Sequence, residues 1–87
     1  MFLHLGSNVS ISSRDIIAIF DLTSTHSTDT RSFLQTAKDE GFLVEPVEGE
    51  AKSFVLTANR IYLSPIASLT LRKRLSSLET LDDEEQA

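Results

Sequence analysis

Short runs of alternating hydrophobic and polar residues open the chain, a pattern typical of β-strands. Residues 2–5 and 9–11 are predicted strands, and residues 6–8 (Gly-Ser-Asn) between them supply a hairpin turn. The next predicted strand covers residues 15–22 and is apolar at nearly every position between two acids. The first part of the chain is therefore predicted to be a hairpin followed by a buried strand.

The predicted strand over residues 15–22 is apolar on both of its faces. Successive side chains of a strand point to opposite sides. One side therefore carries Ile16, Ala18 and Phe20, and the other carries Ile17 and Ile19. A chain of 87 residues has little material to cover both sides. Other subunits are expected to supply the second cover, and burial of about 500 Å² of apolar area would contribute on the order of 12 kcal/mol before entropic costs.

Helical spacing replaces alternation over residues 28–40, where Phe33, Leu34 and Ala37 share a face and Gly41 supplies a stop. A second helix is predicted to open at Ser64-Pro65 and to run to about Leu78. Its apolar stripe is made by Leu71, Leu75 and Leu78. Both helices are amphipathic, so each is expected to cover part of a sheet.

Three more strands are predicted over residues 42–47, 53–58 and 61–63, with a hairpin tip at residues 48–52 between the first two. Pro46 cannot donate a ladder hydrogen bond, which favours an edge position or a strand end. The predicted fold class is α+β: a small antiparallel sheet of five or six short strands with two amphipathic helices, assembling into a ring.

The net charge of −5 is concentrated at the end of the chain. Residues 79–87 hold five of the 13 acids and no base, which leaves eight acids and eight Lys or Arg over residues 1–78. Residues 1–78 are predicted to form a single domain, and residues 79–87 an acidic disordered tail. The tail is either a solvated appendage or a screen for the basic helix before it, which would lower nonspecific binding to nucleic acid.

Candidate chemistry for an enzyme is missing from the sequence. The chain has no cysteine, its two histidines (His4 and His26) have no spaced partner ligand, and no serine lies in a Gly-x-Ser-x-Gly elbow. We therefore expect no enzymatic activity, no cofactor and no metal. No apolar run approaches the roughly 18 residues that cross a bilayer, so no membrane partner is expected and a cytoplasmic location is the default.

Arg72-Lys73-Arg74 is the only run of basic residues. Successive helical positions turn by about 100°, so the three side chains cannot share one face. One interpretation is that they flank the buried leucine stripe and complement the helix dipole. The other is a phosphate-contacting ridge that becomes effective when copies of the subunit repeat it.

Five segments, in order and at similar spacing, resemble the RemA/RemB family of bacterial extracellular-matrix regulatory proteins, in particular its RemB-like members. They are residues 3–6 (LHLG), 14–22 (RDIIAIFDL), 52–57 (KSFVLT), 61–65 (IYLSP) and 70–74 (TLRKR). The resemblance covers nearly the whole chain except the acidic end. It implies a cytoplasmic transcriptional regulator of biofilm-matrix genes that assembles into a homo-oligomeric ring and binds DNA. RemA-like members place adjacent arginines after the hairpin glycine, whereas this chain has Glu50 and Ala51 after Gly49 and keeps only Lys52.

Two hypotheses on function therefore stay open. In the first, a ring binds DNA with little sequence preference. In the second, the protein is a scaffold for protein interaction or a partner of a RemA-like protein and does not bind DNA. The candidate DNA-binding residues are Arg14, Lys52, Arg60, Arg72, Lys73 and Arg74, and the candidate oligomer-interface residues are Ile17, Ile19, Phe54 and Tyr62.

Overall fold

The computed structural model of the protein is an α+β fold, with six strands and two helices among the residues that it describes. It describes residues 1–22, 28–45 and 50–86, and for residues 79–86 it describes the backbone only. The elements are β1 (Phe2–Gly6), β2 (Val9–Ser12), the 3₁₀ turn η1 (Ser13–Asp15), β3 (Ile16–Asp21), α1 (Thr28–Asp39), β4 (Leu43–Val44), β5 (Ser53–Thr57), β6 (Ile61–Ser64) and α2 (Ser68–Gln86). The predicted α+β class with two helices is confirmed, as are the positions of most elements; assembly into a ring stays a prediction.

The strands form two sheets, whereas one antiparallel sheet was expected. β1 and β2 pair with each other, and the other four strands form a sheet in the order β3-β5-β6-β4. β4 pairs with β6 in parallel, through Leu43 opposite Ile61 and Val44 opposite Tyr62. The prediction that residues 42–47 and 53–58 form a hairpin was wrong, because the hairpin partner of β5 is β6. Residues 48 and 49 of the predicted hairpin tip, and residues 46 and 47 of the strand predicted before it, lie outside the described residues.

Gly41 lies between the end of α1 and the start of β4, where the chain changes direction. Its φ of +80° suits glycine, and the Gly41 N–H donates to the Lys38 carbonyl at 3.1 Å. The Phe42 N–H donates to the Ala37 carbonyl at 2.8 Å, which completes the hydrogen-bond pattern of a Schellman motif. The predicted helix stop is confirmed, and it places Phe42 beside the start of β6, where the Phe42 carbonyl accepts from the Ile61 N–H.

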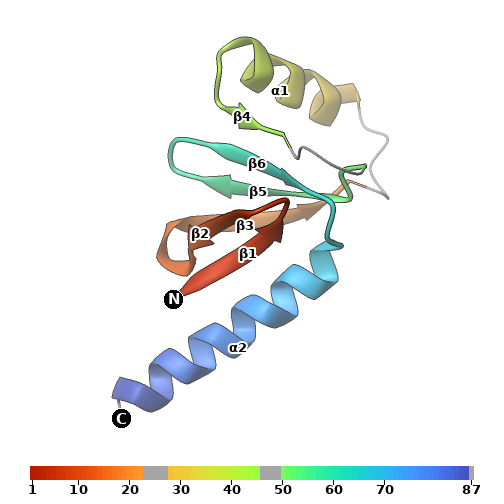
Figure 1. Cartoon of the computed structure of the whole chain (residues 1–87). Helices are drawn as coiled ribbons and strands as arrows, with labels where there is room; N and C mark the ends of the chain where they lie inside the picture. The colour runs from red at the N-terminus through yellow and green to blue at the C-terminus, as the bar shows by residue number, and fades with distance from the viewer. Residues whose placement is uncertain (23–27, 46–49, 87) are drawn as a thin grey trace.

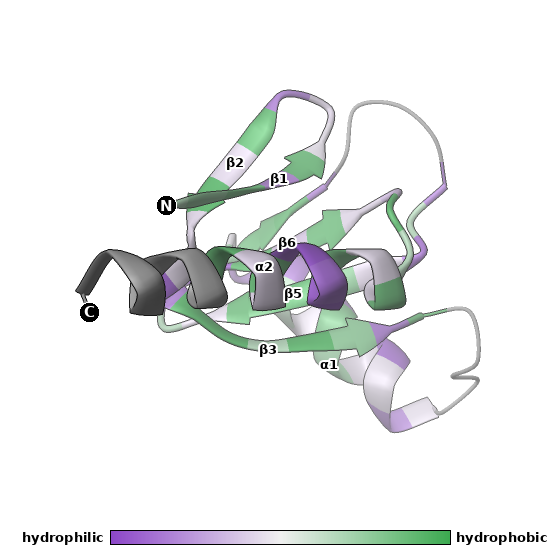
Figure 2. Ribbon diagram, turned by 90° about the horizontal axis from the view of Figure 1, so that it is seen from below, coloured by the Kyte–Doolittle hydropathy of each residue, from purple (hydrophilic) through white to green (hydrophobic). Residues whose placement is uncertain are grey.

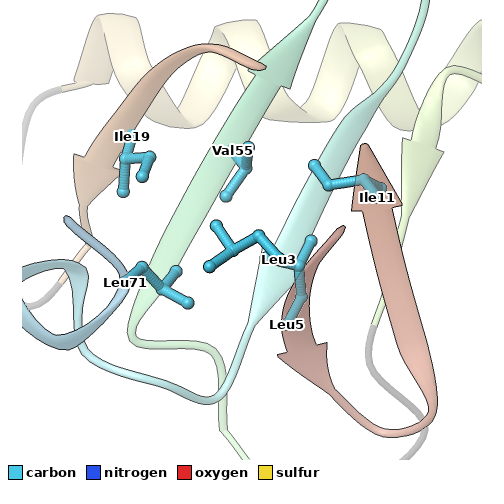
Figure 3. Close-up of a cluster of buried hydrophobic side chains, with 6 residues drawn as sticks. All are labelled: Leu3, Leu5, Ile11, Ile19, Val55 and Leu71. Atoms are coloured by element: carbon cyan, nitrogen blue, oxygen red, sulfur yellow. The ribbon is translucent and has the colours of Figure 1, made fainter. Parts of the chain in front are cut away.

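The main core lies between the four-stranded sheet on one side and the β1–β2 hairpin and α2 on the other (Figures 1 and 3). Val55 of β5 and Leu71 of α2 are completely buried there. The core members are Leu3, Leu5, Ile11, Ile19, Val55 and Leu71. A smaller core of Ala37, Phe54 and Ile61 occupies the opposite face of the sheet, beneath α1. The chain therefore covers one face well and the other only in part.

A β-bulge in β3 changes which side chains share a face. Ile16 lies opposite Thr57, but Ala18 lies opposite Leu56, so Ile17 is an extra residue in the ladder. As a result Ile16 packs with Ile19 on the main core, and Ile17 is left 62% exposed. The strict alternation predicted for this strand was wrong for this reason.

The start of α2 is set by buried serine hydroxyls. Ser64 Oγ donates to the Leu5 carbonyl at 2.7 Å and accepts from the Ile66 N–H at 3.1 Å. Ser53 Oγ donates to the Ile66 carbonyl at 2.7 Å. Because both backbone groups of Ile66 are used in this way, the helix begins at Ser68 and not at Ser64-Pro65 as predicted.

The end of α2 lies further along the chain than predicted. The helix was expected to stop near Leu78, and it continues to Gln86 (Figure 1). Residues 79–86, expected as a disordered tail, therefore have helical backbone here. The division of the chain into a domain over residues 1–78 and an acidic appendage stays a prediction.

Candidate functional site

The six candidate DNA-binding cations do not form one surface in a single chain. Arg14 lies in η1, just before the residue of β3 that pairs with Thr57, and Arg60 follows Thr57 in the β5–β6 turn. These two exposed arginines therefore lie at the same end of the four-stranded sheet. Lys52 precedes β5 at the opposite end, where its N–H donates to the Ser64 carbonyl at 2.8 Å.

Arg72 acts as a link between α2 and β3. One guanidinium nitrogen, Nη2, donates to the Ile19 carbonyl at 2.7 Å. Leu71, the residue before it, is completely buried, so Arg72 flanks the buried stripe as the structural interpretation of the basic run expects. Its hydrogen-bonding capacity is thus partly used inside the protein.

All three residues of the basic run are exposed, and Lys73 and Arg74 follow Arg72 on α2. Figure 2 shows a strongly hydrophilic stretch within α2. A flexible ammonium and a guanidinium at adjacent positions provide donors for phosphate oxygens. A single chain offers only this pair on α2, and repeated copies would be needed for many phosphate contacts.

The candidate interface residues lie mostly inside the chain. Ile19 is 7% exposed and Phe54 is 5% exposed, because each belongs to one of the two cores. Tyr62 is half-buried against the main core, and only Ile17 is well exposed. Ile19 and Phe54 are therefore core residues of the single chain, which leaves Ile17 as the one of the four available to a neighbour.

A row of phenylalanines that the sequence analysis did not single out lies along α1. Phe20, Phe33 and Phe42 are 42%, 47% and 48% exposed, and Phe20 stacks on the buried Phe54 with ring centroids 4.8 Å apart. Two hollows of about 330 and 290 Å³ lie next to these rings, and Phe33 and Leu56 line both. We call this surface the α1 groove and define it by Phe20, Phe33, Phe42 and Leu56.

The sequence did contain a signal for this groove. α1 has few large apolar residues, and in the structure it buries only Ala37. A helix with so narrow an apolar stripe cannot cover the face of a sheet. The phenylalanines of β3 and of the segment after α1 are left partly exposed as a consequence.

Two classes of site find no support in the part of the chain that the structure describes. Residues 1–22, 28–45 and 50–86 contain no cluster of three or more His, Cys, Asp or Glu that could hold a metal ion. Within the same residues, no helix is both long enough and apolar enough to cross a membrane. The exposed cations and the α1 groove are thus the surface features to be explained.

Comparison with known proteins assigns the family. The family model described as RemA-like (Extracellular matrix regulatory protein A-like) matches residues 2–75. The chain belongs to the RemA-like family. It is also 39% identical to Extracellular matrix regulatory protein B of Bacillus subtilis (strain 168) over 82 residues, which cover 94% of this chain and 99% of that protein. The predicted resemblance to RemB-like members is confirmed.

Proposed function

We propose that this RemA-like protein regulates extracellular-matrix genes as a cytoplasmic, non-enzymatic, ring-shaped homo-oligomer that contacts DNA. The observation that carries the proposal is the 39% identity, over nearly the whole chain, to a protein named for extracellular matrix regulation. The sequence contains no pattern of residues typical of a catalytic site, which favours action through binding.

Contact with DNA would use cations repeated around the assembly. Lys73 and Arg74 are exposed on α2, and a ring would place one such pair on every subunit. Each phosphate contact releases condensed counterions, so many weak contacts produce a steep dependence of affinity on salt. Phosphate contacts carry no sequence information, which agrees with binding of low sequence preference.

The test is a titration of DNA binding against salt with matched variants. The variant K73Q/R74Q should bind DNA more weakly and show a shallower slope of log affinity against log salt, by about one to two phosphate contacts per engaged subunit. R31Q, which removes an exposed cation of α1, is the control and should leave affinity and slope unchanged. A wild-type protein that assembles but binds no DNA at low salt would contradict the DNA part of the proposal.

The second candidate function is a scaffold for protein interaction, or a partner of a RemA-like protein, without direct DNA binding. It is favoured by the separation of the candidate cations, which lie at the two ends of the four-stranded sheet and on α2. The exposed phenylalanines of the α1 groove favour it as well. It predicts that nuclease-treated, purified RemA-like protein is retained by the immobilised chain and that R74E is tolerated. Loss of retention after nuclease treatment would favour the first candidate.

A further inference from the structure

The α1 groove leaves more aromatic surface exposed than isolated surface residues would. Four of the five phenylalanines of the chain line it or lie beneath it, and three of them are close to half exposed. Fully buried phenylalanine side chains contribute about 150–250 Å² each, so three half-exposed rings present roughly 300 Å². A stable interface buries about 800 Å² per partner, of which about 60% is apolar. The groove thus supplies a large share of the apolar surface that a stable contact needs.

The hollows of the groove have the size of side-chain pockets. They measure about 330 and 290 Å³. A cavity of about 150 Å³ already holds a benzene molecule. Each hollow is therefore large enough to receive one aromatic or branched aliphatic side chain from a neighbouring molecule.

The same chain exposes side chains of this kind at residues that do not line either hollow. Phe2 is 71% exposed and Ile17 is 62% exposed. Both lie next to η1, because Phe2 pairs with Ser12, the Ser13 N–H donates to the Met1 carbonyl, and Ile17 follows two residues after η1. Figure 1 shows α1 on one side of the sheet and the N-terminus, the β1–β2 hairpin and α2 on the other. We call this second surface the η1 surface and define it by Phe2, Ile17, Arg14 and Asp15.

Each of the two surfaces has one acid and one base at its edge. The η1 surface carries one base and one acid, Arg14 and Asp15, both exposed. The rim of the larger hollow also carries one base and one acid, Arg60 and Glu40. Opposite charges facing each other across an interface set its register and exclude other orientations.

From these observations we infer that the α1 groove of one copy receives Phe2 and Ile17 of the η1 surface of a second copy. In this contact, Arg14 of the second copy faces Glu40 of the first copy. Asp15 of the second copy faces Arg60 of the first copy. The inference rests on the self-assembly in the proposed function and names the two surfaces that make it. Because the two surfaces differ, the contact is head-to-tail. A pair of copies therefore still has one α1 groove and one η1 surface free, and further copies can add until the rotation between copies closes a ring.

This contact separates the roles of the candidate cations. Arg14 and Arg60 belong to the interface between subunits, and Lys73 and Arg74 on α2 are outside it. R60Q should therefore weaken assembly, whereas K73Q/R74Q should weaken DNA binding and leave assembly intact.

The test uses two variants, F33D in the groove and F2D in the η1 surface, measured by light scattering. Each variant alone should dissociate at least tenfold more readily than the wild type and appear as single chains. An equimolar mixture should give two-chain complexes and nothing larger, because one groove and one η1 surface remain intact and meet only once. Both substitutions replace exposed side chains, and circular dichroism checks that each variant is folded.

A second pair of variants tests the charges without touching the phenylalanines. D15R and R60D should each weaken assembly, and the double variant should restore it, since the opposite charges again face each other. L69D, at a helix residue that is 62% exposed and outside both surfaces, is the control and should assemble as the wild type does.

The outcomes separate this inference from the proposed function. A monomeric wild type overturns both. A wild type that assembles while F33D and F2D assemble equally well overturns the inference alone, as does a mixture of the two variants that stays monomeric. Loss of assembly in L69D with assembly kept in F2D would also overturn it.

Discussion

At the residue scale, the turn between β1 and β2 depends on three successive residues with positive φ. Gly6, Ser7 and Asn8 have φ values of +87°, +50° and +64°. Positive φ at the central positions gives a hairpin turn whose twist matches that of the strands. Only Gly6 is also crowded, because a Cβ built there would lie 3.0 Å from Cγ of Pro65.

Gly6 and Gly41 offer a matched pair of substitutions. Gly41 has a φ of +80° but no atom within 4 Å of a built Cβ. Gly41→Ala should therefore cost only the left-handed strain, about 1 kcal/mol of the free energy of unfolding. Gly6→Ala adds the contact with Pro65 and should cost about 2–3 kcal/mol. Urea denaturation measures both, and equal losses would contradict the role given to the close approach of Pro65.

Buried hydroxyls are the second feature at this scale. Ser64 is completely buried and joins β6 to β1 and to the segment before α2. Ser64→Ala leaves the Leu5 carbonyl and the Ile66 N–H without this partner, and should lower the free energy of unfolding by about 2 kcal/mol. Ser77→Ala, which removes an exposed hydroxyl bond to the Lys73 carbonyl within α2, should change it by less than about 0.5 kcal/mol. Thermal or urea unfolding that ranks the two variants in the reverse order would refute this assignment.

At the element scale, β3 is an edge strand of the four-stranded sheet, and α2 protects part of its outer side. The Leu22 N–H donates to the Lys52 carbonyl, and in this antiparallel ladder the peptide groups of Ile19 then point away from β5. Arg72 of α2 donates a hydrogen bond to the Ile19 carbonyl on that outer side. The bond both anchors α2 and occupies part of an edge that could otherwise pair with another strand.

Arg72→Met keeps most of the aliphatic stem and removes the hydrogen bond. We expect a loss of about 1 kcal/mol in the free energy of unfolding, a modest value because the guanidinium is exposed. Lys73→Met, which removes the neighbouring exposed cation, should leave stability unchanged and weaken DNA binding instead. Denaturation curves and DNA titrations on the two variants check this division, and equal stability of both would show that Arg72 does not hold α2 on β3.

At the scale of the whole molecule, charge is distributed unevenly. Residues 1–78 are balanced, and residues 79–87 carry five acids, the first of them five positions after Arg74. Negative charge on the same helix lowers the local positive potential that DNA would meet, over a range of about 10 Å at 0.1 M salt. Removal of this charge should therefore strengthen DNA binding most at low salt.

The sharpest test keeps the helix and removes its charge. Replacing Glu79, Asp82, Asp83, Glu84 and Glu85 by the corresponding amides should raise DNA affinity several-fold at low salt, with the difference shrinking as salt is added. Deletion of residues 79–87 should have the same effect, although it also shortens α2. Unchanged affinity in both variants would retire the screening role of the acidic segment.

Local chemistry was sufficient for much of the fold. The turn at residues 6–8, the helix ending before Gly41, and the strands β5 and β6 were predicted within about two residues of their observed bounds. Turn residues, helix stops and side-chain periodicity act over a few positions, so they can be recognised without knowing the partner element. The family was also predicted from short segments that keep their order.

Long-range contacts decided the remaining features. The parallel pairing of β4 with β6, the bulge that exposes Ile17 and the late start of α2 all depend on segments distant in sequence. Register and pairing are set by which faces can be buried together, and several arrangements satisfy the same local pattern.

For the functional surfaces too, some features follow from the sequence and others only from the tertiary structure. From the sequence alone one obtains the family, the balanced body and the basic run Arg72-Lys73-Arg74. Only the tertiary structure shows that Arg72 donates a hydrogen bond to β3. It also buries Ile19 and Phe54, and it gathers Phe20, Phe33 and Phe42 beside α1. The physical reason is that burial belongs to the packed chain: a helix too narrow to cover its face of the sheet leaves a groove, and no single residue reveals it.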